Sequence, residues 1–134
     1  MQDSFYVKID KKFSKIFFSE IVYVEAVRKY VRIVTVKKVY LPLASMCSIE
    51  QILPSDEFCR IHRSYIVSLR HITDFENDVA YIGNKIFPIG KQHKGAFQKH
   101  VIILASETAS DSELQIDSGK TNFKEIYVLG QTAG

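Results

Sequence analysis

The chain lacks the glycine and histidine patterns on which many phosphate-binding and metal-binding enzymes depend. Its six glycines, at 83, 90, 95, 119, 130 and 134, make neither GxGxxG nor GxxxxGK[ST]. The four histidines, at 62, 71, 93 and 100, form neither HExxH nor a short-spaced Cys/His set, which argues against structural zinc. No nucleophile-elbow glycines surround Ser64. We therefore expect no enzyme activity, no metal, no cofactor and no small-molecule substrate.

Long apolar runs are also missing. No segment has the length of a signal peptide core or approaches the roughly 20 apolar residues of a membrane span. A cytoplasmic protein without a membrane partner is expected. The two cysteines, Cys47 and Cys59, have apolar neighbours and no CxxC spacing, so we predict buried free thiols rather than a redox pair.

Composition and charge indicate one strand-rich domain with a polyanionic partner. The 134 residues suffice for one core, and valine, isoleucine, phenylalanine and tyrosine outweigh alanine and leucine, which favours strands. Residues 1–104 carry sixteen Lys/Arg against ten Asp/Glu, a net charge of +6, whereas residues 105–134 carry −3. A basic domain with an acidic tail suits a polyanion, although a solvated basic surface without a partner is the alternative.

Apolar alternation and turn residues predict short strands through the first hundred residues. Val31 and Ile33 alternate with Tyr30 and Arg32, so the first pair should face a core and the second pair should face outward. Strands are expected at 5–9, 16–18, 21–27, 30–36, 39–41, 58–61, 65–69, 71–76, 79–82 and 85–89.

Two segments change to helical spacing. A short helix should begin after the cap Ser45 and end before Pro54. A second, basic helix is expected over 91–101, with Phe97 and Val101 on its buried side. The apolar positions that share one face of the first helix are Met46, Ile49, Ile52 and Leu53.

Residues 1–104 and 105–134 are expected to form a domain and a tail. Residues 105–113 are small, polar and acidic, which is the composition of a linker. Residues 114–129 predict an additional hairpin around Ser118-Gly119.

Three basic clusters fall where loops or element ends are expected. Long cations can bind guanine or phosphate, glutamine can bind adenine, and hydroxyl groups suit phosphate. Each cluster alone is also consistent with a polar loop, and His62 alone with a structural histidine. The clusters point to DNA only if they share one face of the molecule. They are Arg28-Lys29-Tyr30, on a connection of hairpin length, His62-Arg63-Ser64-Tyr65, and Lys91-Gln92-His93-Lys94.

Several longer stretches resemble a known family. EIVYVEAVRKYVRIVT, LPLASMCSIEQIL, FCRIHRSYIVSLRHI and IFPIGKQHKGAF are similar to the LytTR DNA-binding domain, which ends many bacterial response regulators of the LytR/AgrA type. The resemblance runs from about Phe5 to Ile103, and its most specific part is Phe58 to Leu69.

The resemblance implies an all-β fold, an elongated packing of small antiparallel sheets with one or two short helices. It also implies an output domain of a transcriptional regulator in a two-component system. Such a domain binds promoter direct repeats of double-stranded DNA as two copies, and its loops enter successive major grooves. Carried onto this chain, the contacts fall on Lys29 and Tyr30 (with Val31 as the neighbouring alternative), Arg63 after His62, and Lys91 with its neighbours. The predicted DNA-binding residues are Arg28, Lys29, Tyr30, His62, Arg63, Ser64, Lys91, Gln92 and Lys94.

The chain departs from the family pattern at several points. Ser68 stands where asparagine is common, and Gly90-Lys91 stands where Ser-Arg is common. Only arginine offers a rigid two-pronged donor, so the base preference at Lys91 is open. About five residues precede the resemblance, too few for a receiver domain, so we expect either an excised output domain or a stand-alone member.

Two other functions are consistent with parts of the sequence. A β-rich protein-interaction module would use a sheet edge or the C-terminal tail. A single-strand binder would use Tyr30, Tyr65 and Phe87 as stacking platforms, although strand positions favour a core role for these aromatics.

Overall fold

The computed structural model describes residues 2–105 and 124–127 as short strands and a few helical turns. The helices are α1 (Met46–Ile52) and α2 (Lys94–Gln98), with 3-10 turns η1 (Phe18–Glu20), η2 (Leu69–His71) and η3 (Lys91–His93). The strands are β1 (Ser4–Ile9), β2 (Lys12–Phe17), β3 (Ile21–Val27), β4 (Tyr30–Thr35), β5 (Val39–Tyr40), β6 (Phe58–His62), β7 (Tyr65–Ser68), β8 (Asp74–Phe75), β9 (Val79–Ile82), β10 (Lys85–Pro88), β11 (Ile102–Ala105) and β12 (Lys124–Tyr127).

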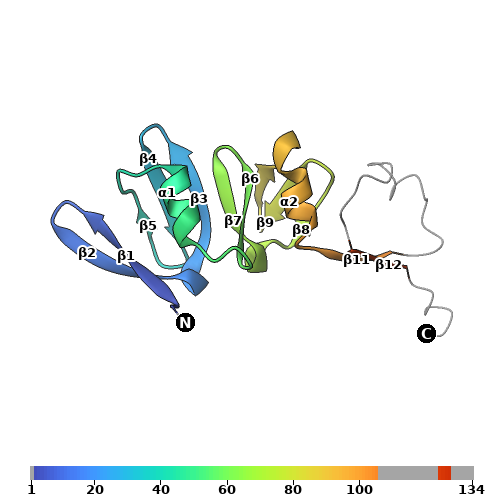
Figure 1. Ribbon diagram of the computed structural model, residues 1–134, viewed down its shortest axis with the longest axis horizontal. Helices are drawn as coiled ribbons and strands as arrows, with labels where there is room; N and C mark the ends of the chain where they lie inside the picture. The colour runs from blue at the N-terminus through green and yellow to red at the C-terminus, as the bar shows by residue number, and fades with distance from the viewer. Residues whose placement is uncertain (1, 106–123, 128–134) are drawn as a thin grey trace.

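A five-stranded antiparallel sheet of order β5-β4-β3-β7-β6 forms the centre of the fold. The β1–β2 hairpin and α1 lie on one side of it, and the small sheet β10-β9-β8 and α2 lie on the other. These units follow one another along the long axis of the molecule (Figure 1). The predicted all-β fold, an elongated packing of small antiparallel sheets with two short helices, is confirmed.

The central sheet buries both of its faces, which produces two cores. In β4, Val31 and Ile33 are buried while Tyr30 is exposed, as the alternation predicted. The first core lies on the α1 side and contains Val7, Ile16, Phe18, Ile21, Val24, Val31, Ile33, Met46, Ile49, Leu53, Phe58 and Ile66. The second core lies on the α2 side and contains Tyr23, Cys59, Ile61, Val67, Ala80, Phe87, Ile89 and Phe97.

Helix α1 follows its predicted signals. The Ser45 side chain accepts a hydrogen bond from the backbone N–H of Ser48 at 3.0 Å, and Pro54 follows the helix end. Met46 and Ile49 are buried, whereas Ile52, predicted on the same face, is 47% exposed. Leu53, which directly follows the helix, is buried in the first core.

The predicted helix over 91–101 is shorter and divided into η3 and α2. It ends at Gln98, because the N–H groups of His100 and Val101 bond three residues back, to Phe97 and Gln98, before β11 begins. Gly95 also weakens helix formation in this segment. Phe97 is buried and Val101 packs against the second core, as predicted.

Smaller expectations need correction at element ends. The strand predicted at 16–18 is β2, which begins at Lys12 and stops at Phe17. The strand predicted at 71–76 shortens to β8, because η2 occupies residues 69–71. A three-residue turn cannot be distinguished from a strand by apolar alternation alone.

Both cysteines are free, but only Cys59 is buried, so the prediction was wrong for Cys47. Cys47 lies on the exposed side of α1. Burial, with a smaller effect of the Glu50 charge, raises the pKa of the Cys59 thiol to about 11. Cys59 therefore stays protonated and unreactive at neutral pH.

Most of the hairpin predicted over 114–129 lies outside the described residues. Its described part, β12, pairs in parallel with β11. No helix in the described ranges is long and apolar enough to cross a membrane.

Candidate nucleic-acid interface

Two hairpin tips lie side by side at one end of the central sheet. Arg28-Lys29 forms the tip between β3 and β4, and Arg63-Ser64 forms the tip between β6 and β7. Because β3 and β7 are antiparallel neighbours, the N–H of Ala26 donates to the carbonyl of Ser64 at 2.9 Å. Both tips are at the top of Figure 1.

The third basic cluster joins them through a close backbone contact. The N–H of Gly90 donates to the carbonyl of Ile61 at 2.6 Å, which places the start of η3 beside the end of β6. A Cβ at position 90 would lie 3.2 Å from the His93 ring and 3.6 Å from the Ile61 carbonyl. A side chain at position 90 would therefore be tightly packed against the His93 ring, although the backbone of Gly90 (φ −66°) is one that any residue adopts.

The structure therefore brings the three predicted clusters together, at what we call the basic end of the molecule. Six of the nine predicted residues are exposed there: Arg28, Lys29, Tyr30, Arg63, Lys91 and Gln92. The other three, His62, Ser64 and Lys94, are half-buried.

The backbone at one tip is strained. Arg28 has φ 59°, in the left-handed region that glycine or asparagine usually occupies. The two-residue connection without either residue was visible in the sequence, and this φ is its structural consequence. Strain of this kind is concentrated at functional sites.

A family model described as the LytTr DNA-binding domain matches residues 11–101. The chain belongs to this family. DNA binding in transcription regulation is therefore its function class, and the family is a DNA-binding domain rather than a catalytic one.

Two individual proteins are similar to the chain. A Bacillus anthracis protein described as sensory transduction protein LytT is 37% identical over 57 residues, which are 42% of this chain. The match covers only 23% of that relative's length. A solved LytTr DNA-binding domain of a putative methyl-accepting/DNA response regulator from Bacillus cereus has a TM-score of 0.64 at 24% identity. That comparison covers 75% of this chain and 97% of the solved chain, and it supports the fold.

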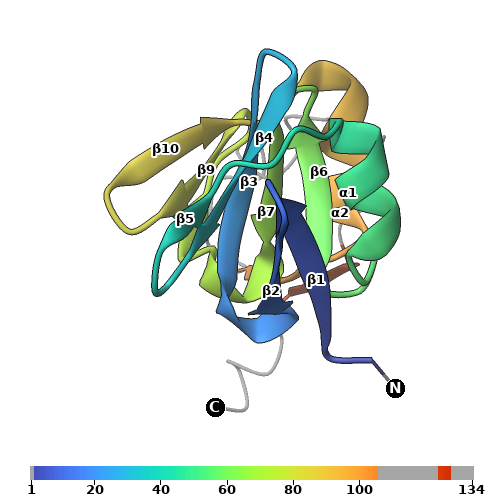
Figure 2. The same cartoon turned by 90° about the vertical axis from the view of Figure 1, so that its left-hand side faces the viewer.

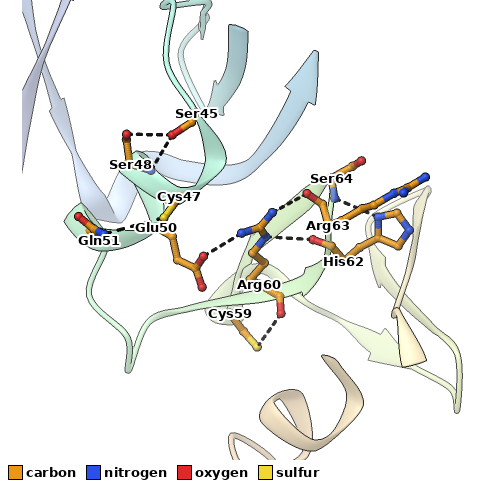
Figure 3. Close-up of polar contacts among 10 residues, drawn as sticks. All are labelled: Ser45, Cys47, Ser48, Glu50, Gln51, Cys59, Arg60, His62, Arg63 and Ser64. Atoms are coloured by element: carbon orange, nitrogen blue, oxygen red, sulfur yellow. Dashed lines mark hydrogen bonds and ion pairs between the residues drawn. The ribbon is translucent and has the colours of Figure 1, made fainter. Parts of the chain in front are cut away.

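In this LytTr domain, Arg60 anchors the β6–β7 tip from below (Figure 3). Its guanidinium donates to the carbonyls of Arg63 at 2.7 Å and His62 at 3.4 Å. It also pairs with Glu50 of α1 at 3.0 Å. Sequence reasoning missed this role, because the sequence of a strand does not indicate which acceptors the guanidinium of one of its arginines will contact.

A β-bulge changes the direction of His62. The register between β6 and β7 shifts between Arg60 and His62, so His62 lies near Gly90 while Arg60 reaches α1. Nδ1 of His62 accepts a hydrogen bond from the Ser64 N–H at 3.1 Å, which holds the tip backbone. Burial lowers the pKa of His62, and the charges of Arg63 and His93 lower it further. The ring is neutral at pH 7, and its Nε2 carries the proton.

Below the tips, a polar network joins three strands of the sheet. Arg32 donates to the Tyr23 hydroxyl and pairs with Glu25, each at 3.1 Å. The Tyr65 hydroxyl donates to the other Glu25 oxygen at 3.4 Å. The hydrogen bond to Tyr23 is the main cause that raises the pKa of Arg32. The cross-strand pair Glu25–Arg32 was the sequence signal that could have revealed this network.

The aromatics named for a single-strand binder occupy different environments. Phe87 is fully buried, and Tyr65 packs edge-on against it with ring centroids 5.2 Å apart. Tyr30 is exposed, at 39%, and Tyr65 is half-buried. Three stacking platforms on one surface are therefore not formed.

Proposed function

We propose that this LytTr domain recognises specific double-stranded DNA through its basic end, with the two hairpin tips and the η3 segment in the major groove. The observation that carries the proposal is the gathering of three basic clusters, distant in sequence, at one end of one sheet. Arg63, Lys91 and the Lys29–Tyr30 tip would contact base edges. The neighbouring cations and the Ser64 hydroxyl would contact phosphates.

The spacing of the contacts supports recognition over more than one stretch of groove. The three segments are offset along the long axis of the molecule rather than combined in one recognition helix (Figure 1). We propose that two copies bind promoter direct repeats and that the domain is the output part of a response regulator. Most of the affinity would come from phosphate contacts, so it should fall steeply with salt.

Selection of bound duplexes from a random library, at two salt concentrations, tests the proposal. Enrichment of one repeated motif, with weaker binding at higher salt, is the expected result. Absence of any enriched motif, or binding that ignores salt, would contradict it. A tagged full-length chain would then be used to capture a protein partner, with deletion of residues 105–134 as the comparison.

A further inference from the structure

The β1–β2 hairpin has one buried face and one unusual exposed face. Val7 and Ile16 point into the first core. On the opposite face, Tyr6 is 61% exposed, Phe13 63% and Phe17 37%. Three large aromatic rings therefore lie on one open face of a two-stranded hairpin.

Lysines lie between these rings. In the antiparallel register Lys15 is opposite Tyr6 and Lys8 is opposite Phe13. Lys8 Nζ is 5.5 Å from the Phe13 ring centroid, and Lys15 Nζ is 5.9 Å from that of Tyr6 and 5.2 Å from that of Phe17. Contacts of this kind stabilise an ammonium group over a ring without neutralising its charge.

The hairpin is strongly basic, because Lys11 and Lys12 at its tip add to Lys8 and Lys15. Residues 4–17 contain these four lysines and one acid, Asp10, a net charge of +3. Within the described parts of the chain, no ion pair joins these lysines to a carboxylate. Their charge is therefore available to an anion from outside.

The position of the hairpin indicates which anion. Its tip points toward the same end of the molecule as the β3–β4 tip, in both views (Figures 1 and 2). The hairpin lies at the outer end of the long axis, beyond the β3–β4 tip, and its own tip is set back from the level of that tip (Figure 1). Duplex DNA is a linear polyanion with about one charge per 1.7 Å of axis, so DNA bound at the basic end would continue past the hairpin.

We propose that the outer face and tip of the β1–β2 hairpin bind the phosphate backbone of duplex DNA that flanks the specifically recognised site. Lys8, Lys11, Lys12 and Lys15 supply the charge, and Tyr6, Phe13 and Phe17 hold the ammonium groups in place and pack against deoxyribose. The inference rests on the proposed function of the basic end and adds a separate, sequence-independent contact to it.

The experiment compares two duplexes, one with only the selected motif and one extended by about 10 base pairs on each side. Wild-type affinity should rise with the extension, and log Kd should depend more steeply on log salt, by roughly 0.9 for each added phosphate contact. The variant Lys8→Gln/Lys15→Gln and the variant Lys11→Gln/Lys12→Gln should bind the extended duplex on the order of tenfold more weakly than wild type at 0.1 M salt. Replacement of the same lysines by arginine should keep the affinity.

The charge-loss control is Lys37→Gln/Lys38→Gln, in which Lys37 pairs with Glu20 at 3.1 Å. These two lysines lie in the β4–β5 turn at the opposite end of β4, and Lys38 also sits over a ring, that of Tyr40, at 4.9 Å. The control loses the same charge but should bind both duplexes as wild type does, apart from a small uniform change.

Each outcome decides the proposal. If the hairpin variants bind the extended duplex as tightly as the control variant does, the proposal is wrong. An acidic protein surface would then be the alternative partner of this face. Hairpin variants that lose affinity only for single-stranded DNA would also overturn the proposal. Failure of the basic end itself is distinguishable, because Arg63→Ala would then leave binding to the short duplex unchanged.

Discussion

The two cores on either side of the central sheet differ in chemistry. The first core is mainly aliphatic, with Ile16, Ile21 and Ile33 fully enclosed. The second core contains aromatic rings in edge-on contact, with the Phe87 ring centroid 4.8 Å from that of Tyr23. Edge-on ring pairs bury apolar area and also prefer a particular relative orientation of the two rings. Aliphatic contacts have no such orientational preference.

This difference corresponds to a difference in position. The second core continues into the basic end, because Ile61 precedes His62 and Ile89 precedes Gly90. Tyr65, which packs against it, directly follows the β6–β7 tip. We infer that the first core mainly stabilises the fold and that the second core also positions the β6–β7 tip and the η3 segment of the proposed DNA-binding surface.

The largest expected effects come from truncation of one residue in each core. Phe87→Ala should lower the free energy of unfolding by about 3–5 kcal/mol and Ile33→Ala by about 2–5 kcal/mol, through lost burial and a cavity. Both are measured by urea unfolding followed by circular dichroism. At a temperature where both variants are folded, only Phe87→Ala should weaken DNA binding. Equal weakening by Ile33→Ala would remove the distinction between the cores.

Arg63→Ala should next separate binding from stability. Loss of one good base contact should cost about 1–3 kcal/mol of DNA-binding free energy. The free energy of unfolding should change by less than about 0.5 kcal/mol, since the side chain is exposed. Arg70→Ala is the matched control, because Arg70 is an exposed arginine past the opposite end of β7. Titration of a labelled duplex measures the binding, and an unchanged affinity for Arg63→Ala would refute the assignment.

Arg60→Gln should show how strongly the tip depends on its anchor. The variant loses the guanidinium donors to the Arg63 and His62 carbonyls, which should cost about 1 kcal/mol of folding stability. DNA affinity should fall less than for Arg63→Ala, through poorer positioning of the tip. Glu50→Gln removes the ion pair but leaves the carbonyl bonds, so it should bind DNA as wild type does. A comparable loss in Glu50→Gln would assign the effect to α1 instead.

Arg28→Gly should raise stability while it lowers affinity. Glycine relieves the left-handed backbone strain, and after its own entropy cost we expect a gain of about 0.5–1 kcal/mol. Asp10→Gly is the control, since Asp10 has φ 60° at the β1–β2 tip. It should give a smaller gain in thermal unfolding, because aspartate tolerates the left-handed region better than arginine, and no loss of affinity, because it removes the one acid of residues 4–17. A fall in stability for both would show that the tips are not strained.

The smallest effect concerns the pH dependence of stability. The pKa of His62 is lower in the folded chain than the ordinary histidine pKa of about 6.5. As pH falls below about 6.5, the unfolded chain therefore binds more protons at His62 than the folded chain does. The contribution of neutral His62 to the free energy of unfolding is therefore fully present above about pH 6.5, and it is lost as pH falls through the folded pKa. His71, whose pKa is also lowered by burial, acts in the same direction. Denaturant titrations of wild type and His62→Gln should converge toward low pH, and parallel curves would contradict this.

Much of the fold follows from local pattern. Val31 and Ile33 alternate with Tyr30 and Arg32, and the side-chain period of two assigns them to opposite faces. Ser45 and Pro54 delimit α1, because a capping hydroxyl and a missing N–H act within one turn. The burial of Ile52 and the length of α2 were predicted wrongly, since the burial of single helical positions and the point at which a helix ends depend on tertiary packing as well as on spacing.

Residue types and family resemblance also located the candidate DNA contacts, but not their arrangement. The three clusters were recognisable as Arg28-Lys29, Arg63 and Lys91 in a basic domain. Whether they share a surface depends on the β3–β7 pairing and on the bond from Gly90 to Ile61, each of which joins residues tens of positions apart. Hydrogen bonds between distant strands leave no periodic trace in the sequence.

By itself, then, the sequence determined the all-β class, the short strands and the basic residues, because these depend on side-chain periodicity and charge over a few neighbouring positions. Only the tertiary structure decided that the tips meet at one end, that Arg60 anchors one of them and that a bulge turns His62 toward Gly90. It also decided that the lysines and rings of the first hairpin share an open face. The physical reason is that backbone pairing and the burial of the opposite face are non-local, and they fix direction in space as well as element type.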